Sequence, residues 1–193
     1  MTSAPVLGEP LPVELMNTVW ADRDGVHDSL DSPAGLADWL AAVRPRLPHL
    51  PESGPLPLAE FRRLRDALRV LAAAVTEDTR STRELDVESA VDVLNASCAY
   101  APNWSAMTWP DTLTKIAAQP FADAALSIIA EEAVALFAGP DRSRLRACYA
   151  PTCVLFFIRN HPRREWCSAS CGNRARVARH YRRHHADSEQ GRS

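Results

Sequence analysis

Apolar residues recur at helical spacing along the first two thirds of the chain. The clearest run lies between residues 58 and 75, where an apolar side chain returns every three or four positions and arginines fill the opposite face. This periodicity is that of an amphipathic helix with one buried stripe. The stripe consists of Leu58, Phe61, Leu64, Leu68, Leu71 and Val75.

Two more segments have both a helical pattern and clear boundary signals. Ser32 is suited to cap a helix and Pro33 to occupy its first position, which predicts a helix over residues 33–43. A second helix is expected from Pro120 to Gly139, where a glycine followed by proline ends it.

Residues 87–98 predict a further helix. Its apolar positions Val91, Leu94 and Cys98 align on one face. Cys98 is therefore interpreted as a small core residue rather than a nucleophile.

A short β hairpin is predicted around residues 104–109, within a segment rich in turn-forming residues. The helical signals stop at Gly139–Pro140. We therefore expect a mainly α chain (α+β overall), with a helical domain over residues 1–140 and a smaller domain over residues 141–193.

Composition narrows the class of protein. The chain has 193 residues, 24% of them charged, which is typical of a folded domain with a small appendage. The first ten residues lack a basic stretch followed by an apolar one, and no later segment approaches about 18 uncharged apolar residues. These features predict a cytoplasmic protein without a membrane partner.

Charge divides the chain into an acidic body and a basic end. Residues 1–141 hold 10 basic and 21 acidic side chains, whereas residues 142–193 hold 12 arginines and 3 acidic side chains. A basic end of this kind suggests a polyanionic partner, although a solvated tail has the same composition.

Four of the five cysteines form the pattern C-x4-C-x13-C-x3-C, at Cys148, Cys153, Cys167 and Cys171. Two close pairs separated by a hairpin-sized insert are typical of a structural Zn²⁺ site, because each pair supplies two thiolates from one turn. Two disulfides are the competing interpretation, and a cytoplasmic location disfavours them. Four thiolates would close the coordination sphere, so the metal would be structural rather than catalytic.

The insert between the pairs suggests a small finger fold. Residues 154–158 are β-rich, residues 160–162 favour a turn, and a return strand is expected towards Trp166. A helix without proline follows Cys167 and would carry Cys171 in its first turns. Knuckle, hairpin and helix together predict a treble-clef-like zinc finger.

The arginines of this last helix divide between two faces at about 100° per residue. Arg174 falls in the same arc as Val177 and Tyr181, which are expected to pack on the hairpin, so it should support the zinc site. The other helical arginines form a separate basic face that suits phosphates, on which Gly172 would let another backbone approach. The predicted nucleic-acid contacts are Arg176, Arg179, Arg182 and Arg183, extended by Arg163 and Arg164 of the hairpin.

The segments "CYAPTC" and "WCSASCGNRARVARHYRR" resemble the CGNR zinc-finger family of bacteria. The motif that names the family is found at Cys171, Gly172, Asn173 and Arg174, and the spacing of all four cysteines also matches. Upstream, residues 15–40 are similar to the start of the ABATE domain that usually precedes this finger in stress-induced transcription regulators.

This resemblance implies a metal-stabilised DNA-binding end joined to a regulatory, ligand-sensing body. It carries over the four zinc ligands and gives Asn173 and Arg174 a supporting role. The candidates for effector binding are Asn17, Thr18, Trp20 and Arg23, which could equally form a capped and packed N-terminal helix.

Two functions remain open. The first is a transcription regulator that binds double-stranded DNA and responds to a small molecule. Since one finger gives a small interface, such a regulator would act as a homodimer or make a supporting contact elsewhere. The second is a zinc-stabilised module that binds a protein or RNA. An enzyme is not expected, because no catalytic constellation or phosphate-binding loop stands out.

Overall fold

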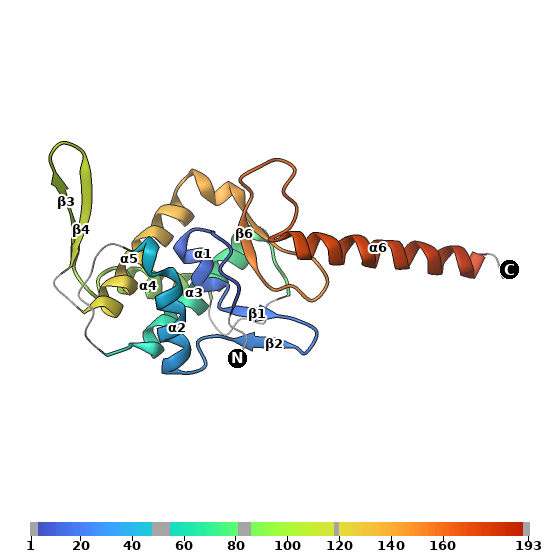
Figure 1. Cartoon of the computed structure of the whole chain (residues 1–193), viewed down its shortest axis with the longest axis horizontal. Coiled ribbons are helices and arrows are strands. Elements are labelled where there is room, and N and C mark those ends of the chain that lie inside the picture. The colour runs from blue at the N-terminus through green and yellow to red at the C-terminus, as the bar shows by residue number, and fades with distance from the viewer. Residues whose placement is uncertain (1–3, 48–54, 81–85, 118–119, 191–193) are drawn as a thin grey trace.

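The computed structural model describes residues 4–47, 55–80, 86–117 and 120–190. It confirms a mainly α fold with short antiparallel strand pairs (Figure 1). The helices are α1 (Leu11–Met16), α2 (Pro33–Val43), α3 (Leu58–Thr76), α4 (Val87–Cys98), α5 (Phe121–Ala138) and α6 (Ala169–Gln190), with 3-10 turns at Arg44–Arg46 and Pro140–Arg144. The strand pairs are β1 (Val19–Ala21) with β2 (Val26–Asp28), β3 (Asn103–Thr108) with β4 (Thr112–Ala117), and β5 (Leu145–Ala147) with β6 (Phe156–Ile158).

Helix α3 forms the centre of the body and has the predicted buried stripe. Phe61, Leu64 and Leu68 are fully buried against α1, α4 and α5. The helix ends at Glu77, whose left-handed backbone (φ 55°) turns the chain, while its N–H donates to the Ala73 carbonyl. This turn directs the following residues towards the C-terminal part of the chain.

The caps of α2 and α4 explain where these helices begin. Ser32 Oγ accepts from the Gly35 N–H at 3.2 Å, as predicted for α2. Asp86 caps α4 in the same way by accepting from the Ser89 N–H at 2.7 Å.

The predicted inward face of α4 is partly wrong. Val91 is 40% exposed, whereas Ala90, Val93 and Leu94 are buried. The contacts with α3 and α5 rotate the helix away from the alignment that local spacing suggested. Cys98 is partly buried and packs against the core, as expected.

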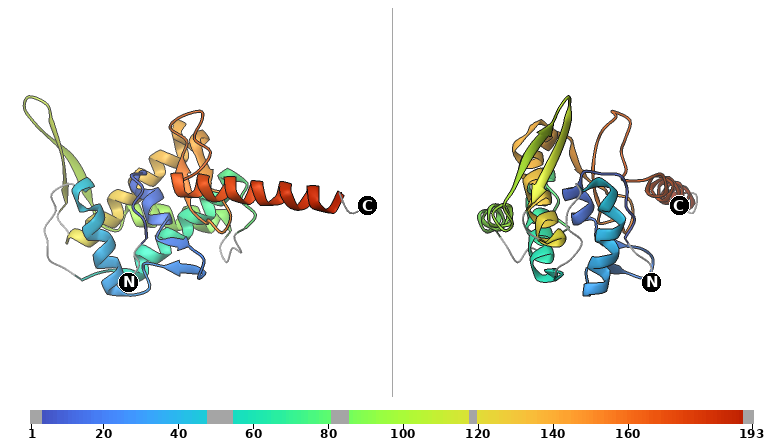
Figure 2. Two further views of the ribbon diagram at one scale, coloured as in Figure 1. Left: turned by 45° about the vertical axis from the view of Figure 1, so that its right-hand side comes forward. Right: turned by 60° about the vertical axis from the view of Figure 1, so that its left-hand side comes forward.

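The β3–β4 hairpin and α6 extend from opposite ends of the body, as Figures 1 and 2 show. A hairpin is found here, but the predicted range of residues 104–109 covers only β3 and the tip, because the return strand β4 lies at Thr112–Ala117. Trp109 at the tip is 83% exposed. Helix α6 leaves the body beyond its first turns and carries the chain towards the C-terminus. Within the described residues no helix is both long and apolar enough to cross a bilayer.

The C-terminal hairpin β5–β6 is continuous with the helical core. Leu145, Ala147, Phe156 and Ile158 are buried in the same cluster as the apolar residues of α1, α3 and α5. The cysteine-rich segment is therefore built onto the body, and its helix α6 projects from there.

Candidate metal centre and basic helix

The four cysteine side chains converge in one buried cluster. Their Sγ atoms all lie within 4.8 Å of one another. Cys167 Sγ is 3.8 Å from Cys153 Sγ and 3.4 Å from Cys171 Sγ. A tetrahedral Zn²⁺ with Zn–S bonds of about 2.3 Å requires sulfur atoms about 3.8 Å apart. The four cysteines therefore fit one structural zinc ion, and four thiolates would leave no open position on it.

The first cysteine pair is held by a tight turn after β5. The Cys148 N–H donates to the Leu155 carbonyl at 2.9 Å, and the Cys153 N–H donates to the Ala150 carbonyl at 3.0 Å. Between them Thr152 has a φ of 65°, which reverses the chain within four residues. The turn brings both thiols to one side.

The second pair straddles the start of α6. Ser168 Oγ accepts from the Cys171 N–H at 3.3 Å and fixes the first turn. A Cβ on Gly172 would lie 3.2 Å from Cδ1 of Trp166. The glycine therefore makes room for this ring, and the expectation that it admits another backbone is wrong.

The return strand predicted after residues 160–162 is not found among the described residues, because β6 pairs with β5 instead. The edge of β6 that does not pair with β5 is bound by side chains of the body. Asn17 Oδ1 accepts from the Phe156 N–H at 2.9 Å, and Glu9 Oε2 accepts from the Ile158 N–H at 2.9 Å. These side chains take the donors that a third strand would need.

Arg174 lies against the metal centre. Its Nη2 donates to Cys171 Sγ at 3.0 Å, and its Nε is buried without a hydrogen-bond partner in the described part of the chain. Hydrogen bonds with Cys148, Cys153 and Cys167 lower the pKa of the Cys171 thiol, which favours the thiolate that binds metal. Arg174 thus adds a positively charged donor at one of the four sulfur atoms.

Replacing this arginine should weaken the zinc site selectively. We expect Arg174→Ala to lose zinc faster in a chelator challenge than wild type, because the thiolate cluster is deprived of a charge-assisted hydrogen bond. Arg179→Ala is the matched control, since it removes an exposed arginine from the same helix. The assignment of helix faces would be refuted if Arg179→Ala released zinc faster.

The donors of Arg164, a predicted nucleic-acid contact, are occupied within the protein. Its Nη1 donates to the Ile158 carbonyl at 3.0 Å, and its Nη2 donates to the Cys167 carbonyl at 2.9 Å and to Glu9 Oε1 at 2.5 Å. The guanidinium also lies 4.9 Å from the centre of the Phe157 ring. These contacts hold the loop before α6 against the body and leave the side chain 22% exposed.

Of the remaining predicted arginines, the four whose side chains the structure describes are exposed. Arg163 lies on the loop after β6. The other three, Arg176, Arg179 and Arg182, lie on α6, and we call these three the basic face. Arg176 donates to Asn173 Oδ1, which orients it along the helix. The side chain of Arg183 lies outside the described residues.

The opposite side of α6 does not pack on the hairpin, contrary to expectation. Val177 is 54% and Tyr181 63% exposed, because the helix has already left the body at these positions. They line an open groove of about 790 Å³ together with Asp22 and Arg23 of the β1–β2 turn.

An arginine from the loop after α3 holds the first cysteine turn. Arg80 Nη1 donates to the carbonyls of both Cys148 and Cys153, at 2.7 Å each. Its Nε and Nη2 bind Asp78, and its guanidinium lies 4.3 Å from the centre of the Tyr149 ring. The hydrogen bond from Arg80 lowers the pKa of the buried Asp78 carboxyl. Local sequence patterns do not predict this contact, since Arg80 is about 70 residues away from Cys148 and Cys153 in the chain.

Trp20 and Arg69 strengthen the same junction. Trp20 belongs to the apolar cluster around the four cysteines, although it comes from β1. Arg69 of α3 donates to the Met16 carbonyl at 2.8 Å and to the Val154 carbonyl at 3.3 Å, and burial lowers its pKa to about 10. The body thus contributes side chains to both the inside and the rim of the finger.

Asn17 and Thr18, two of the candidate effector residues, are fully buried and used internally. Asn17 forms a pair of hydrogen bonds with the backbone of Phe156, at 2.9 Å each. The Thr18 hydroxyl donates to the Leu15 carbonyl at 2.8 Å. Their polar groups are occupied, so the structure corrects the expectation that they contact an effector.

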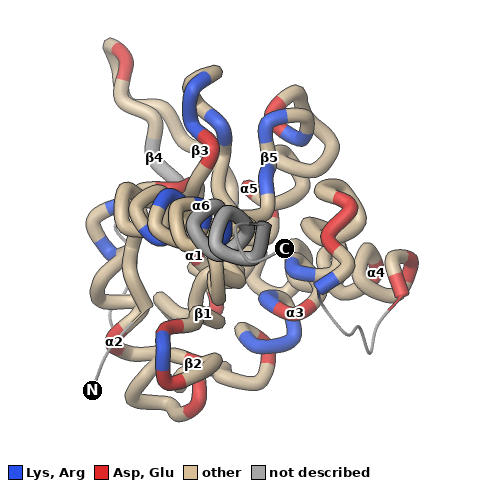
Figure 3. Tube along the Cα trace, turned by 90° about the vertical axis from the view of Figure 1, so that its right-hand side faces the viewer, with Lys and Arg blue, Asp and Glu red and all other residues tan. Residues whose placement is uncertain are grey.

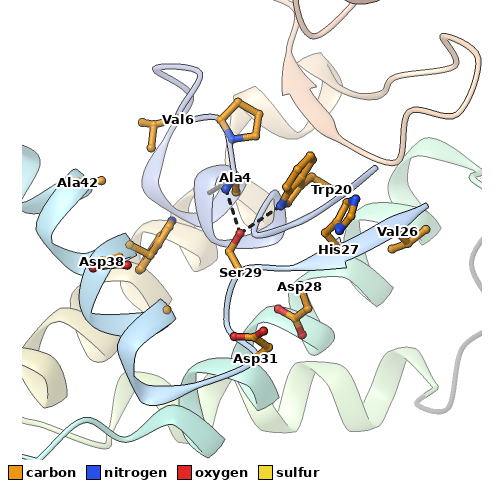
Figure 4. Close-up of a pocket in the computed structure, with 13 residues that line it drawn as sticks. Ala4, Val6, Trp20, Val26, His27, Asp28, Ser29, Asp31, Asp38 and Ala42 are labelled. Carbon is orange, nitrogen blue, oxygen red and sulfur yellow. Dashed lines mark hydrogen bonds between the residues drawn. The ribbon is translucent and has the colours of Figure 1, made fainter. Parts of the chain in front are cut away.

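Trp20 lines a hollow of about 890 Å³ between α2 and the β1–β2 pair (Figure 4). Its Nε1 donates to Ser29 Oγ at 3.1 Å, and its ring stacks on His27 with 4.5 Å between centroids. Asp31 and Asp38 give the hollow an acidic rim, whereas the third carboxylate that lines it, that of Asp28, pairs with Arg65 at 2.5 Å. Arg23, the fourth candidate, lies at the groove beside α6 instead.

Comparison with known families agrees with this arrangement. Residues 9–140 match the ABATE family, described as "Putative stress-induced transcription regulator". Residues 144–184 match the CGNR zinc finger. A comparison with curated proteins gave no match. With the family match covering most of the chain and the four cysteines in place, the protein belongs to the ABATE family and carries a CGNR zinc finger at its C-terminal end.

Proposed function

We propose that this protein is a cytoplasmic transcription regulator that binds double-stranded DNA through its zinc finger. The zinc ion would hold α6 rigidly at its first turn, and the body would carry the regulatory site. The metal would have no catalytic part, because four thiolates complete its coordination.

The basic face of α6 is the observation that carries this proposal. Arg176, Arg179 and Arg182 are exposed. They lie on a helix that projects from the body, as Figures 1 and 2 show. A projecting helix can enter or follow a DNA groove, and its arginines can neutralise phosphates on either side. The acidic body would be repelled by the same phosphates, which orients the finger towards the duplex.

The dependence of duplex binding on salt tests this function. Replacing Arg176, Arg179 and Arg182 together with Ala should reduce the slope of log affinity against log salt by roughly 0.9 for each phosphate that the variant no longer neutralises. Zinc content should stay at the wild-type level, because the basic face does not touch the cysteines. Arg63→Ala, which removes an exposed arginine of α3, is the control and should leave the slope unchanged. An unchanged slope in the triple variant would exclude the basic face as the DNA-binding surface.

A protein- or RNA-binding module is the second candidate. The exposed Val177 and Tyr181 favour it, since an apolar stripe on a projecting helix suits a protein surface, and an exposed tyrosine can stack on an unpaired base. In that case the basic face would only support solubility, and duplex binding would be weak even at low salt.

We also propose that the hollow beside Trp20 is the effector site. Its size lies in the range of small-molecule sites, and it combines two tryptophans, Trp20 and Trp39, with the acidic rim. Since Trp20 also packs on the cysteine cluster, a ligand there would touch the finger's own core. Two copies of the chain would act together on DNA, because one finger buries a small interface.

A further inference from the structure

A second group of arginines surrounds the β5–β6 hairpin, outside the basic face. Arg142, Arg144, Arg146 and Arg159 come from the 3-10 turn, β5 and the residue after β6, and we call them the hairpin surface. Arg142, Arg144 and Arg159 are exposed, and Arg146 is half-buried. The acidic residues of this part of the chain are Asp141, which pairs with Arg144 at 2.7 Å, and the exposed Glu165.

The hairpin brings these arginines together. Arg144 and Arg159 lie side by side, because the Arg159 N–H donates to the Arg144 carbonyl at 2.8 Å and Arg144 Nε donates to the Arg159 carbonyl at 3.3 Å. Arg142 and Arg146 line one hollow of about 530 Å³, with Ser143 between them. Arg146 is oriented there by its bonds to the carbonyls of Ser143 and Leu145.

Two of the four guanidinium groups are unused. In the part of the chain that the structure describes, the side chains of Arg142 and Arg159 form no hydrogen bond or ion pair. This distinguishes them from Arg164, whose donors are all directed at the protein. Exposed arginines held on a hairpin, with free donors and few neighbouring carboxylates, suit an anionic partner.

The loop that follows the hairpin surface reaches the start of the basic face of α6. Trp166 of this loop and Arg176 of the basic face both lie beside Gly172. A Cβ atom built on Gly172 would be 3.2 Å from Trp166 Cδ1 and 3.7 Å from Arg176 Nη1. The basic face therefore begins beside the loop that continues from Arg159. Figure 3, which looks down the axis of α6, shows the arginine-bearing segment of β5 above this helix. One extended polyanion could contact both.

We propose that the hairpin surface is a second phosphate-binding site, which holds the DNA backbone beside the segment contacted by α6. This inference rests on the proposed function and extends the DNA contact to residues outside α6. The site would bind phosphates without reading bases, because arginines on a short hairpin outside the groove reach only the backbone.

Salt-dependent binding of a labelled duplex to the full zinc-loaded chain tests the inference. The double variant Arg142→Ala/Arg159→Ala should reduce the log–log slope by about one to two units, at roughly 0.9 per phosphate. It should weaken binding equally for unrelated duplex sequences. Arg142→Lys/Arg159→Lys, which keeps the charges, should restore most of the slope, and Arg63→Ala should not change it.

The outcomes separate the two proposals. If the wild type and the Ala double variant have the same slope while Arg179→Ala lowers it, the hairpin surface does not bind DNA and the proposed function stands. If the wild-type chain binds no duplex even at low salt, both proposals are wrong. Unchanged zinc content in the double variant excludes misfolding as the cause of a reduced slope.

Discussion

Removing zinc from the four-cysteine site is expected to destabilise the helical body as well as the finger. The apolar cluster around the cysteines includes Trp20 of the body, and β5–β6 shares its core with α1, α3 and α5. Zinc-binding free energies of about 10–16 kcal/mol are coupled to folding in small zinc domains. Without the metal, the four cysteines are no longer held together by bonds to one ion, so the finger can open and expose the core side of the hairpin.

Thermal unfolding followed by circular dichroism measures this coupling. We expect Cys171→Ser, or the wild-type chain in excess chelator, to unfold on the order of 10 °C or more below the zinc-loaded protein, since about 1 kcal/mol shifts the Tm of a chain this size by roughly 2–4 °C. Cys98→Ser is the matched control, because Cys98 lies on α4 far along the chain from the four-cysteine cluster. A helical transition that keeps its midpoint in chelator would show that body and finger are independent.

Replacing Arg80 should produce the second largest effect. Arg80→Ala removes the donor shared by the Cys148 and Cys153 carbonyls and takes away a charged partner of Asp78, whose side chain is 5% exposed. Breaking a buried ion pair by removing one partner costs about 3–5 kcal/mol. The partial exposure of Arg80 places the expected loss of unfolding free energy at the lower end, about 3 kcal/mol.

Urea denaturation of a double-mutant cycle tests the Arg80 prediction. The variant Asp78→Ala/Arg80→Ala should lose less unfolding free energy than the sum of the losses in the two single variants. The double variant removes both members of the ion pair, so the Asp78 carboxylate is not left buried without Arg80. Arg80→Ala should also retain zinc less well, while Arg63→Ala should match the wild type. If the losses of unfolding free energy in the two single variants add up to that of the double variant, and zinc retention is normal, then Arg80 does not hold the cysteine turn.

Local sequence patterns predicted the parts of the fold that depend on near neighbours. The stripe of α3, the Ser32 cap and the cysteine spacing all involve residues within a few positions of one another. The errors concern contacts across the chain. The predicted return strand is not found beside β6, because Asn17 and Glu9, which lie 139 and 149 residues away in the chain, occupy that edge.

The arginines illustrate the same limit for the site. Helical phase separated Arg174 from the basic face, and Arg174 does lie against Cys171. Arg164 could not be assigned in this way, because its partner Glu9 lies far along the sequence. Arg80 was missed for the same reason. Charge counts identify a basic end, but only tertiary contacts show which of its arginines are occupied.

The most direct test of the account compares zinc-loaded wild-type protein on three labelled nucleic acids of equal length: a DNA duplex, an RNA hairpin and a DNA single strand. Affinities are measured by fluorescence anisotropy over a range of salt concentrations. We expect the tightest binding to the DNA duplex, with a log–log slope of several units that corresponds to several neutralised phosphates. Tighter binding to the RNA hairpin, or no duplex binding at low salt, would contradict a DNA-binding finger and favour the interaction module.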